Sequence, residues 1–350
     1  MREFSYEQLP GRVIFGPGCL DRIGEEVARL GARRTLLLGT KGGSRLLGRV
    51  AGLLGEAHAG TFGDVEPHVP IEAVRDARAL AGALAADLVV TVGGGSTTGL
   101  GKALALDPGV PFLAVPTTYA GSEQTPIYGI TADGVKRTGR DTRVLPRTVL
   151  YDPVLTLTLP PSVAGPSGMN ALAHCVEALY AAEPNPITAL KAAEGIRALA
   201  AGLPRVVADP ADLGARGLAL YGAFLAGSAL ANVGMAVHHR ICHVLGGTFG
   251  LAHGDANAVV LPYAVAYNAA HAPEAMATLA SALGVNDPVA GVHDLADRLG
   301  VPRSLAALGM AEADLDRAAR LAAEPPPYNP RPVDVPGIRR LLEDAFQGSR

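Results

Sequence analysis

The stretch DLVVTVGGGSTTGLGKALAL, Asp87 to Leu106, decides the fold. Its first part, Asp87 to Val92, is a short apolar run typical of a parallel strand that is buried on both faces. Gly93, Gly94 and Gly95 follow directly, and a helix is expected after them. Glycine lets the backbone approach a ligand closely, and a helix amino terminus offers free amides and a positive dipole end. This strand, turn and helix are therefore typical of a phosphate-binding unit.

Three further apolar runs extend the pattern on both sides of this stretch: Thr35 to Gly39, Pro111 to Pro116 and Thr148 to Asp152. Segments with helical apolar spacing, Leu20 to Leu30 and Ile71 to Leu84, lie between the strands. Alternating strands and helices predict a doubly wound parallel sheet with helices on both faces. We therefore expect a Rossmann-like α/β domain.

The pattern changes character once along the chain. A hairpin is expected at PIYGITADGVKRTG, with its turn at Asp133 and Gly134. After LPPS, Leu159 to Ser162, the strand signals stop, and Ala- and Leu-rich helical stretches run to the end. We therefore predict an α/β domain over residues 1–160 and an all-α domain over residues 161–350.

Length, charge and cysteine content limit the class of protein. A chain of 350 residues suits two domains better than one core. The net charge of -3 gives no basic footprint for nucleic acid or an anionic membrane. Cys19, Cys175 and Cys242 are too few and too scattered for a disulfide framework, which fits a reducing cytoplasm. The amino terminus lacks an apolar signal core, and Gly, Pro or charge interrupts each apolar run before membrane-spanning length. We expect a cytoplasmic protein whose partners are small molecules and other subunits.

Polar loops follow two consecutive strands of the predicted sheet, one from Gly93 and one at PTTYAGSE after Pro116. Ligands of open parallel sheets bind at such carboxyl ends. The first loop is not the GxGxxG fingerprint, and it departs from the Walker pattern because Ser96 replaces the first Gly and Ala103 follows Lys102. A tight turn without a ligand is the alternative, but two adjacent loops favour a nucleotide. The expected cofactor-binding residues here are Gly93, Gly94, Gly95, Ser96, Thr97, Thr117, Thr118, Tyr119 and Ser122.

A second polar constellation lies in the helical half. Asn170 and His174 stand four apart in GMNALAHCVEALY, so they share one helix face. In HHRICHVLGGTFGLAH, His239 stands four residues before His243 and fourteen before His253. Three neutral imidazoles with one carboxylate make a familiar divalent-metal site. Here Asn170 stands where the carboxylate is expected, so either a metal or a substrate could occupy the site.

Several motifs, in order, resemble the iron-type alcohol dehydrogenase superfamily: FGPG (Phe15 to Gly18), GGGSTTGLGK, PTTYAGSE, the pair Asp152 and Pro153, and the helix with Asn170 and His174. Within it, KRTGRDTRVLPRTVLYDP, SGMNALAHCVEALYA, HHRICHVLGGTF and YNPRP are similar to the maleylacetate reductases. The resemblance covers nearly the whole chain. It implies a dehydroquinate synthase-like architecture, NADH or NADPH as cofactor, and commonly a homodimer. It also implies reduction of maleylacetate, a dicarboxylate, to 3-oxoadipate during degradation of aromatic compounds.

The superfamily's ligand set of one Asp and three His falls on Asn170, His174, His239 and His253. Asn in the first position resembles the maleylacetate reductases, which implies a site without metal, and a neutral donor also attracts a divalent cation less. Three imidazoles alone can hold zinc, so Fe²⁺ or Zn²⁺ in a metal-dependent alcohol dehydrogenase stays the alternative. Without metal, His243 or His239 would donate to an enolate oxygen or supply the proton. Asn170, His174 and His253 would orient a carboxylate or ketone.

Cofactor choice and substrate charge have weaker signals. Thr40 follows a strand at the position where an Asp would exclude a 2'-phosphate, so we expect NADH with tolerance for NADPH. A basic run could neutralise the substrate carboxylates or could be solvated surface. This run consists of Lys136, Arg137, Arg140 and Arg143.

Other residues leave alternatives open. Glu177 lies about one turn after His174 and would fix an imidazole tautomer, cap a helix or lie at the surface. Asp255, Asn257 and Tyr263 depart from the maleylacetate reductase pattern, so the exact substrate is open. A non-catalytic nucleotide-binding protein, or a relative acting on glycerol phosphate or dehydroquinate, is a further alternative.

Overall fold

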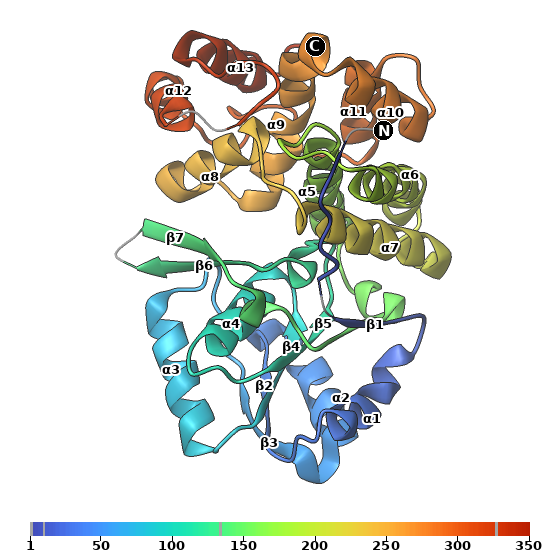
Figure 1. Ribbon diagram of the computed structural model, residues 1–350, viewed down its shortest axis with the longest axis vertical. Helices are drawn as coiled ribbons and strands as arrows, with labels where there is room; N and C mark the ends of the chain where they lie inside the picture. The colour runs from blue at the N-terminus through green and yellow to red at the C-terminus, as the bar shows by residue number, and fades with distance from the viewer. Residues whose placement is uncertain (1–2, 10, 133–134, 326–327) are drawn as a thin grey trace. The chain divides into compact units, whose positions relative to one another are not determined.

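The computed structural model forms two compact units (Figure 1). It describes residues 3–9, 11–132, 135–325 and 328–350. One unit spans Gln8–Leu159 and carries all the strands. The other spans Pro160–Arg350, together with the segment that ends at Glu7, and is helical in the described residues. The predicted architecture, a Rossmann-like parallel sheet followed by a helical half, is confirmed.

Six parallel strands form the main sheet in the order β1-β8-β5-β4-β2-β3. Every residue of β2, β5 and β8 is buried, because helices cover both faces of the sheet, and these strands therefore read as unbroken apolar runs. The four predicted strands correspond to β2, β4, β5 and β8. The strands are β1 (Arg12–Phe15), β2 (Thr35–Leu38), β3 (His58–Phe62), β4 (Leu88–Gly93), β5 (Phe112–Pro116) and β8 (Thr148–Tyr151).

The two edge strands of the sheet, β1 and β3, were not predicted. In β1 only Ile14 is buried, and in β3 no residue is fully buried. An edge strand pairs on one side only and needs no continuous apolar run, so the strand signal in the sequence is weak. The sheet therefore extends one strand beyond the predicted set at each end.

Helices cover both faces of this sheet, as expected (Figure 1). The helices α1 (Ile23–Arg29) and α2 (Ser44–Leu54) pack on one face, where Val50 and Val90 belong to one apolar core. The other face carries α3 (Ile71–Ala83) and α4 (Gly95–Leu106) (Figure 1).

The topology places a crevice at the carboxyl ends of β2 and β4. These strands are neighbours, but the chain leaves β2 towards β3 on one side and leaves β4 towards β5 on the other. Loops that diverge in this way open the space where nucleotides bind in doubly wound sheets.

The predicted hairpin is present as β6 (Ile127–Ala132) and β7 (Val135–Arg140), which pair antiparallel. Its expected turn residues, Asp133 and Gly134, lie outside the described residues. The main chain of β6 also bonds the loop after β3, since the amide of Thr131 donates to the carbonyl of Val69 over 3.0 Å.

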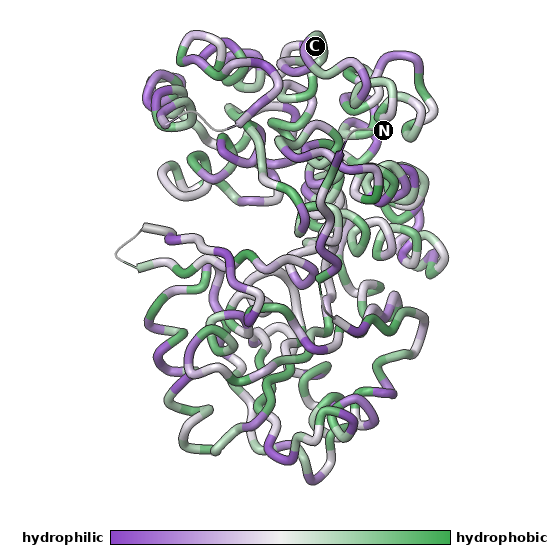
Figure 2. The backbone as a smooth tube through the Cα atoms, in the orientation of Figure 1, coloured by the Kyte–Doolittle hydropathy of each residue, from purple (hydrophilic) through white to green (hydrophobic). Residues whose placement is uncertain are grey.

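The helical unit is built around α5, which begins at Pro161 and is buried along most of its length. It packs against α6, α7 and α9. Hydrophobic and hydrophilic residues alternate along the outer helices of the unit (Figure 2). The helices are α5 (Pro161–Leu179), α6 (Pro186–Ala208), α7 (Leu213–Leu230), α8 (Val237–Phe249), α9 (His253–Asn268), α10 (Pro273–Leu283), α11 (Pro288–Arg298), α12 (Leu315–Ala323) and α13 (Val335–Gln347).

One helix bears on the expectation that Gly, Pro or charge interrupts each apolar run before membrane-spanning length. Within the described residues, α7 alone is long and apolar enough to do so by length and composition. However, α7 packs against α5 and α6, and it carries the buried Arg216, whose Nε donates to the carbonyl of Pro210 over 3.1 Å. These contacts are those of a core helix in a helical bundle.

Candidate active site

The glycine-rich turn leaves no room for side chains where β4 meets α4. Gly93 has φ of 156°, and a Cβ there would lie 2.4 Å from Oγ1 of Thr97. A Cβ on Gly94 would lie 3.0 Å from Cγ2 of Thr118. Gly94 is the N-cap of α4 and makes no side-chain cap, so the first-turn amides suit an anion at the positive end of the helix. The observed turn has the geometry expected for a phosphate cradle.

The two predicted loops lie side by side. The amide of Thr117 donates to the carbonyl of Gly93 over 3.0 Å, and Gly93 lies opposite Pro116 in the sheet. Thr97 and Tyr119 are buried and support the turn from within. Ser122 begins a short 3-10 turn further along the second loop. The structure therefore groups the following predicted residues at the carboxyl ends of β4 and β5: Gly93, Gly94, Gly95, Ser96, Thr97, Thr117 and Thr118.

Lys102 on α4 anchors the second loop, a role that the sequence did not reveal. Its side chain is buried, and Nζ donates to the carbonyls of Ser122, Thr125 and Ile127 over 2.7, 2.8 and 2.6 Å. Burial lowers the pKa of Lys102 to about 7, against the opposing effect of the Glu123 carboxylate. The available signal was a single charge in the otherwise small and apolar helix GLGKALAL.

Thr40 lies just after β2 and lines a separate pocket of about 440 Å³. Ser44 and Leu47 on α2 and Asp64 after β3 also line it. Nζ of Lys41 lies 3.2 Å from Oδ1 of Asp64, and both side chains are exposed. Its place at the carboxyl end of β2 suits the adenosine half of a dinucleotide.

The described side chains of the basic run lie in different surroundings. Arg143 is bound to Asp141, with Nη2 2.7 Å from Oδ2, and its Nη1 donates to the carbonyl of Leu106. Leu106 ends α4, about 16 Å from the glycine turn at 1.5 Å per residue. Arg137 and Arg140 are exposed on β7, and the side chain of Lys136 lies outside the described residues.

In the helical unit, the predicted histidines from three helices form a row. The ring centroids of His174 and His239 lie 4.9 Å apart and the rings are stacked. The centroid of His243 lies 6.3 Å from that of His239 and 6.2 Å from that of His253. Asn170 is buried one turn before His174 on α5. The structure thus brings the predicted histidines together, with Asn170 on the same helix as the first of them.

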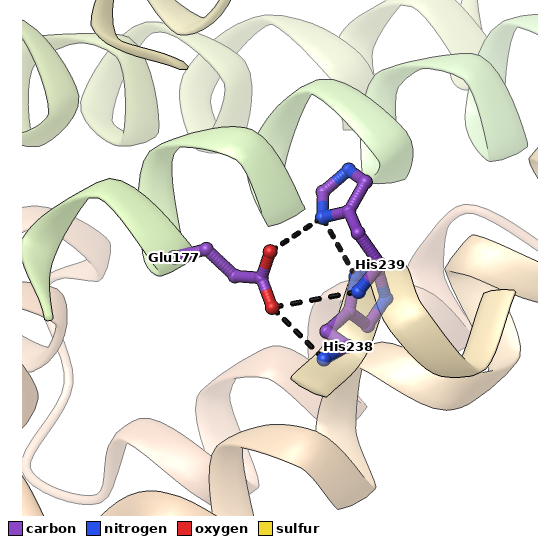
Figure 3. Close-up of side chains that lie close together, drawn as sticks. All are labelled: Glu177, His238 and His239. Carbon is purple, nitrogen blue, oxygen red and sulfur yellow. Dashed lines mark hydrogen bonds and ion pairs between the residues drawn. The ribbon is translucent and has the colours of Figure 1, made fainter. Parts of the chain in front are cut away.

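A buried carboxylate, Glu177 on α5, joins this row to the start of α8 (Figure 3). Oε2 lies 2.6 Å from Nδ1 of His239 and accepts the amide of Ala236 over 3.0 Å. Oε1 accepts the amide of His238 over 2.8 Å and that of His239 over 3.4 Å. Of the positions left open for Glu177, the surface position is wrong, because the side chain is buried. Glu177 contacts both an imidazole and the first backbone amides of a helix.

Burial keeps His174, His238 and His239 neutral near pH 7. Burial and the neighbouring histidines together lower the pKa of His239 to about 3 and that of His238 to about 4. The pKa of His174 is well below its ordinary value for the same reasons. Burial raises the pKa of Glu177, whereas His238 and three backbone amides oppose this rise. Three backbone amides donate to the two oxygens and favour the charged form, so we take Glu177 as the carboxylate.

One group of potential metal ligands lies beside the row. Among the described His, Cys, Asp and Glu side chains, it brings together ligand atoms of Glu177, His238 and His239 within 4.8 Å of one another. The Glu177 group is engaged in hydrogen bonds, including that between Nε2 of His238 and the carbonyl of Asn257 at 3.1 Å.

Three buried polar atoms in the row have no hydrogen-bond partner in the described part of the chain. They are Oδ1 of Asn170, Nδ1 of His174 and Nε2 of His239. Buried polar atoms are normally paired, so such a group indicates where a ligand or water binds.

The departures from the maleylacetate reductase pattern fall in different places. Asn257 supports the row, because its Nδ2 donates to the carbonyl of His253 over 2.7 Å. Asp255 lies in the first turn of α9, and burial raises its pKa. Tyr263 packs edge-on against His293 and lines another pocket of about 180 Å³. It stands ten residues after His253 on α9, about 15 Å along the helix axis.

Comparison with known proteins assigns the class. The model for iron-containing alcohol dehydrogenases matches residues 10–153, and the model for the C-terminal part of the Fe-containing alcohol dehydrogenase family matches residues 165–346. The chain therefore belongs to the iron-containing alcohol dehydrogenase family. It is an oxidoreductase, and this membership supports NAD(H) binding by the α/β unit.

The most similar relatives narrow this class. Maleylacetate reductase from Burkholderia cepacia is 52% identical over 350 residues, covering 100% of this chain and 99% of the relative. Maleylacetate reductase from Sphingobium indicum is 49% identical, covering 99% of this chain and 98% of the relative. The crystal structure of maleylacetate reductase from Agrobacterium tumefaciens has a TM-score of 0.97 at 46% identity and covers 100% of both chains. The resemblance inferred from the motifs is confirmed.

Proposed function

We propose that the protein reduces the carbon–carbon double bond of maleylacetate with NADH to give 3-oxoadipate, as a step in the degradation of aromatic compounds. The observation that carries this proposal is the end-to-end similarity to maleylacetate reductases, at 52% identity over 350 residues. The neutral His174 and His239 next to Asn170 support it, since a dicarboxylate substrate needs hydrogen-bonding groups without negative charge.

The reaction requires a hydride, a proton and a place for transient negative charge. Bound NADH supplies the hydride, which adds to the carbon β to the ketone of maleylacetate. An enolate results, and a proton on the carbon next to the ketone completes 3-oxoadipate. His243 or His239 donates to the enolate oxygen or supplies the proton, because imidazole does both near neutral pH. Asn170, His174 and His253 orient the ketone or a carboxylate.

A metal-free site is part of the proposal. Asn170 contributes an oxygen without charge, which attracts a divalent cation less than a carboxylate does. The alternative is an iron-type alcohol dehydrogenase that uses Fe²⁺ or Zn²⁺ on Asn170, His174, His239 and His253.

Cofactor choice follows from the pocket after β2. Thr40 has no charge to repel a 2'-phosphate, and Lys41 lies beside it with a positive charge. We propose NADH as the main cofactor with tolerance for NADPH. Thr40→Asp should then remove most activity with NADPH and keep that with NADH. A wild-type preference for NADH that is already very large would contradict this proposal.

We further propose a cytoplasmic homodimer. The edge strand β1 carries Val13 and Phe15 with 39% and 41% of their surface exposed, an apolar surface that a second copy would cover. Light scattering after gel filtration should give a dimer, and Val13→Glu should increase the monomer fraction. A wild-type monomer at micromolar concentration would contradict this part.

The proposed function is tested by NADH oxidation with freshly generated maleylacetate, with and without a chelator, together with elemental analysis for iron and zinc. We expect rapid oxidation of NADH that is insensitive to the chelator. Turnover of a simple alcohol only with added metal, while maleylacetate leaves NADH unoxidised, would instead support the metal-dependent alcohol dehydrogenase. No oxidation with either substrate would leave a non-catalytic nucleotide-binding protein.

A further inference from the structure

We propose that Glu177 is a positioning residue that holds His239 in the tautomer with hydrogen on Nδ1, so that Nε2 accepts a hydrogen bond and His243 serves as the donor to the substrate. This inference rests on the proposed reduction for its catalytic consequence. The tautomer itself does not depend on that function, and it is measured separately below.

The first step is the position of Glu177. It lies seven residues after Asn170 on α5, two helical turns along the same face, with His174 between them. Its carboxylate accepts the amides of Ala236, His238 and His239 at the start of α8. Ala236, the N-cap of α8, has no side-chain oxygen and makes no cap. A carboxylate from another helix therefore replaces the missing cap and fixes the start of α8 against α5.

The second step is the state of His238. Its Nε2 lies 3.1 Å from the carbonyl oxygen of Asn257. A carbonyl oxygen only accepts, so Nε2 of His238 carries the hydrogen. In a neutral ring, Nδ1 of His238 is then a lone pair.

The third step fixes His239. Its Nδ1 lies 2.6 Å from Oε2 of Glu177 and 3.4 Å from Nδ1 of His238 (Figure 3). Two acceptors, a carboxylate and a lone pair, therefore face the same nitrogen. A hydrogen on Nδ1 of His239 can be shared between these two acceptors. Without it, the lone pair on Nδ1 would face the lone pairs of Glu177 Oε2 and His238 Nδ1. Nε2 of His239 is then the acceptor, and it is buried with no partner in the described part of the chain.

The consequence is a division of roles between two histidines one turn apart on α8. A neutral His239 in this tautomer has no hydrogen to offer to an enolate oxygen. Its Nε2 accepts a hydrogen bond from a water molecule instead. His243, whose ring centroid lies 6.3 Å from that of His239, is left as the donor. Carboxylates that orient a functional imidazole in this way typically contribute about 10- to 100-fold to activity or binding.

Glu177→Gln tests the proposal because it keeps the shape and removes two of the four lone-pair positions. If the amide nitrogen of glutamine faces His239, it donates to Nδ1 and favours the tautomer with hydrogen on Nε2. We expect kcat to fall about 10- to 100-fold, with a smaller change in KM. Nitrogen-15 NMR of the histidine rings should show protonated Nδ1 for His239 in the unliganded wild type and a changed pattern in the variant.

A matched control separates orientation from helix capping. Ala236→Ser gives α8 a cap of its own. In the Glu177→Gln background it should restore thermal stability without restoring kcat. Recovery of kcat together with stability would mean that Glu177 only caps the helix, and the proposal would be wrong.

A double-mutant cycle with His239→Ala gives a second, independent readout. If Glu177 acts through His239, the double variant should be no slower than the slower single variant. Fully multiplicative losses would overturn the proposal, as would wild-type NMR signals with hydrogen on Nε2 of His239. If the wild type does not reduce maleylacetate at all, the proposed function fails, and the NMR measurement still decides the tautomer.

Discussion

Replacing Lys102 by methionine should loosen the loop that follows β5 and weaken NADH binding. The ammonium makes three bonds to carbonyls, of which that to Thr125 is buried and those to Ser122 and Ile127 are partly buried. Water can replace the partly buried bonds, but the Thr125 carbonyl would lose its partner, at about 1–3 kcal/mol. Methionine also removes the cost of burying a charge, which opposes this loss at pH 7. The pH dependence of the difference between the two proteins therefore tests the prediction better than its value at one pH.

The free energy of unfolding of the wild type should depend on pH through Lys102. The pKa of Lys102 is about 7 in the folded chain and 10.5 ordinarily, so between these values the unfolded chain binds a proton that the folded chain does not. Stability of the wild type therefore rises with pH in this window through Lys102, and Lys102→Met lacks this contribution. The free energy of unfolding of the wild type should therefore rise by about 2 kcal/mol relative to that of the variant from pH 7 to pH 9.

The assay is urea unfolding at both pH values, combined with hydrogen exchange of peptides from residues 117–127 and titration with NADH. The exchange should accelerate, and the dissociation constant for NADH should rise. The matched control is Lys191→Met, because Nζ of Lys191 contacts the hydroxyls of Tyr6 and Ser228 within the helical unit. It should leave NADH binding unchanged. A Lys102→Met protein with wild-type stability, exchange and NADH affinity would refute the reasoning.

Three further predictions concern the helical unit. His243→Ala should lower kcat about 10²- to 10⁴-fold, as expected for a general acid, and stopped-flow NADH oxidation that remains at the wild-type rate would remove its assignment as donor. Asn170→Asp should introduce a buried carboxylate beside neutral imidazoles, so zinc measured by elemental analysis should rise and maleylacetate reduction should become sensitive to zinc; equal zinc content in both proteins would count against the role of charge. Tyr263→His should leave kcat/KM for maleylacetate within about twofold, because Tyr263 lies about 15 Å along α9 from His253; a tenfold change would place it in the substrate site.

The central strands of the sheet could be predicted from the sequence because strands that are buried on both faces form nearly continuous apolar runs. In β2 and β5 every residue is buried, and the sequence TLLL or FLAVP leaves few alternatives. Edge strands lack such apolar runs: β3 reads HAGTF, and none of its residues is fully buried. The two edge strands could be recognised only from their pairing with β8 and β2 in the structure.

The site could be predicted where spacing along one helix decides it. Asn170 and His174 share a face because they stand four apart, and the order of His239 and His243 on α8 has the same cause. Distances between helices were not accessible in this way. The structure was needed to show that Tyr263 packs against His293, ten residues after His253 on α9.

Hydrogen bonds between side chains and the backbone also could not be predicted from the sequence. Lys102 donates to three backbone carbonyls that lie 20, 23 and 25 residues further along the chain. Every residue has a backbone carbonyl, so the sequence does not indicate which ones a side chain will contact. Glu177 shows the same limit, since its bonds to the first amides of α8 depend on where that helix begins. In both cases the structure was needed to show that the charged side chain is buried and which backbone groups it contacts.

The charge balance of the histidine row links Asn170 to Glu177. Glu177 is the buried carboxylate that contacts this row, and its oxygens are already engaged by three backbone amides and Nδ1 of His239. No lone pair in good geometry is left on it for a cation. The oxygen of Asn170 is unpaired but neutral, so it gives a divalent ion little compensation for lost hydration. An enone dicarboxylate has the opposite requirement, because a second buried carboxylate would repel it. The same amide that weakens the site for a metal therefore makes it suitable for an anion, and the anchored His239 leaves donation to its neighbour His243.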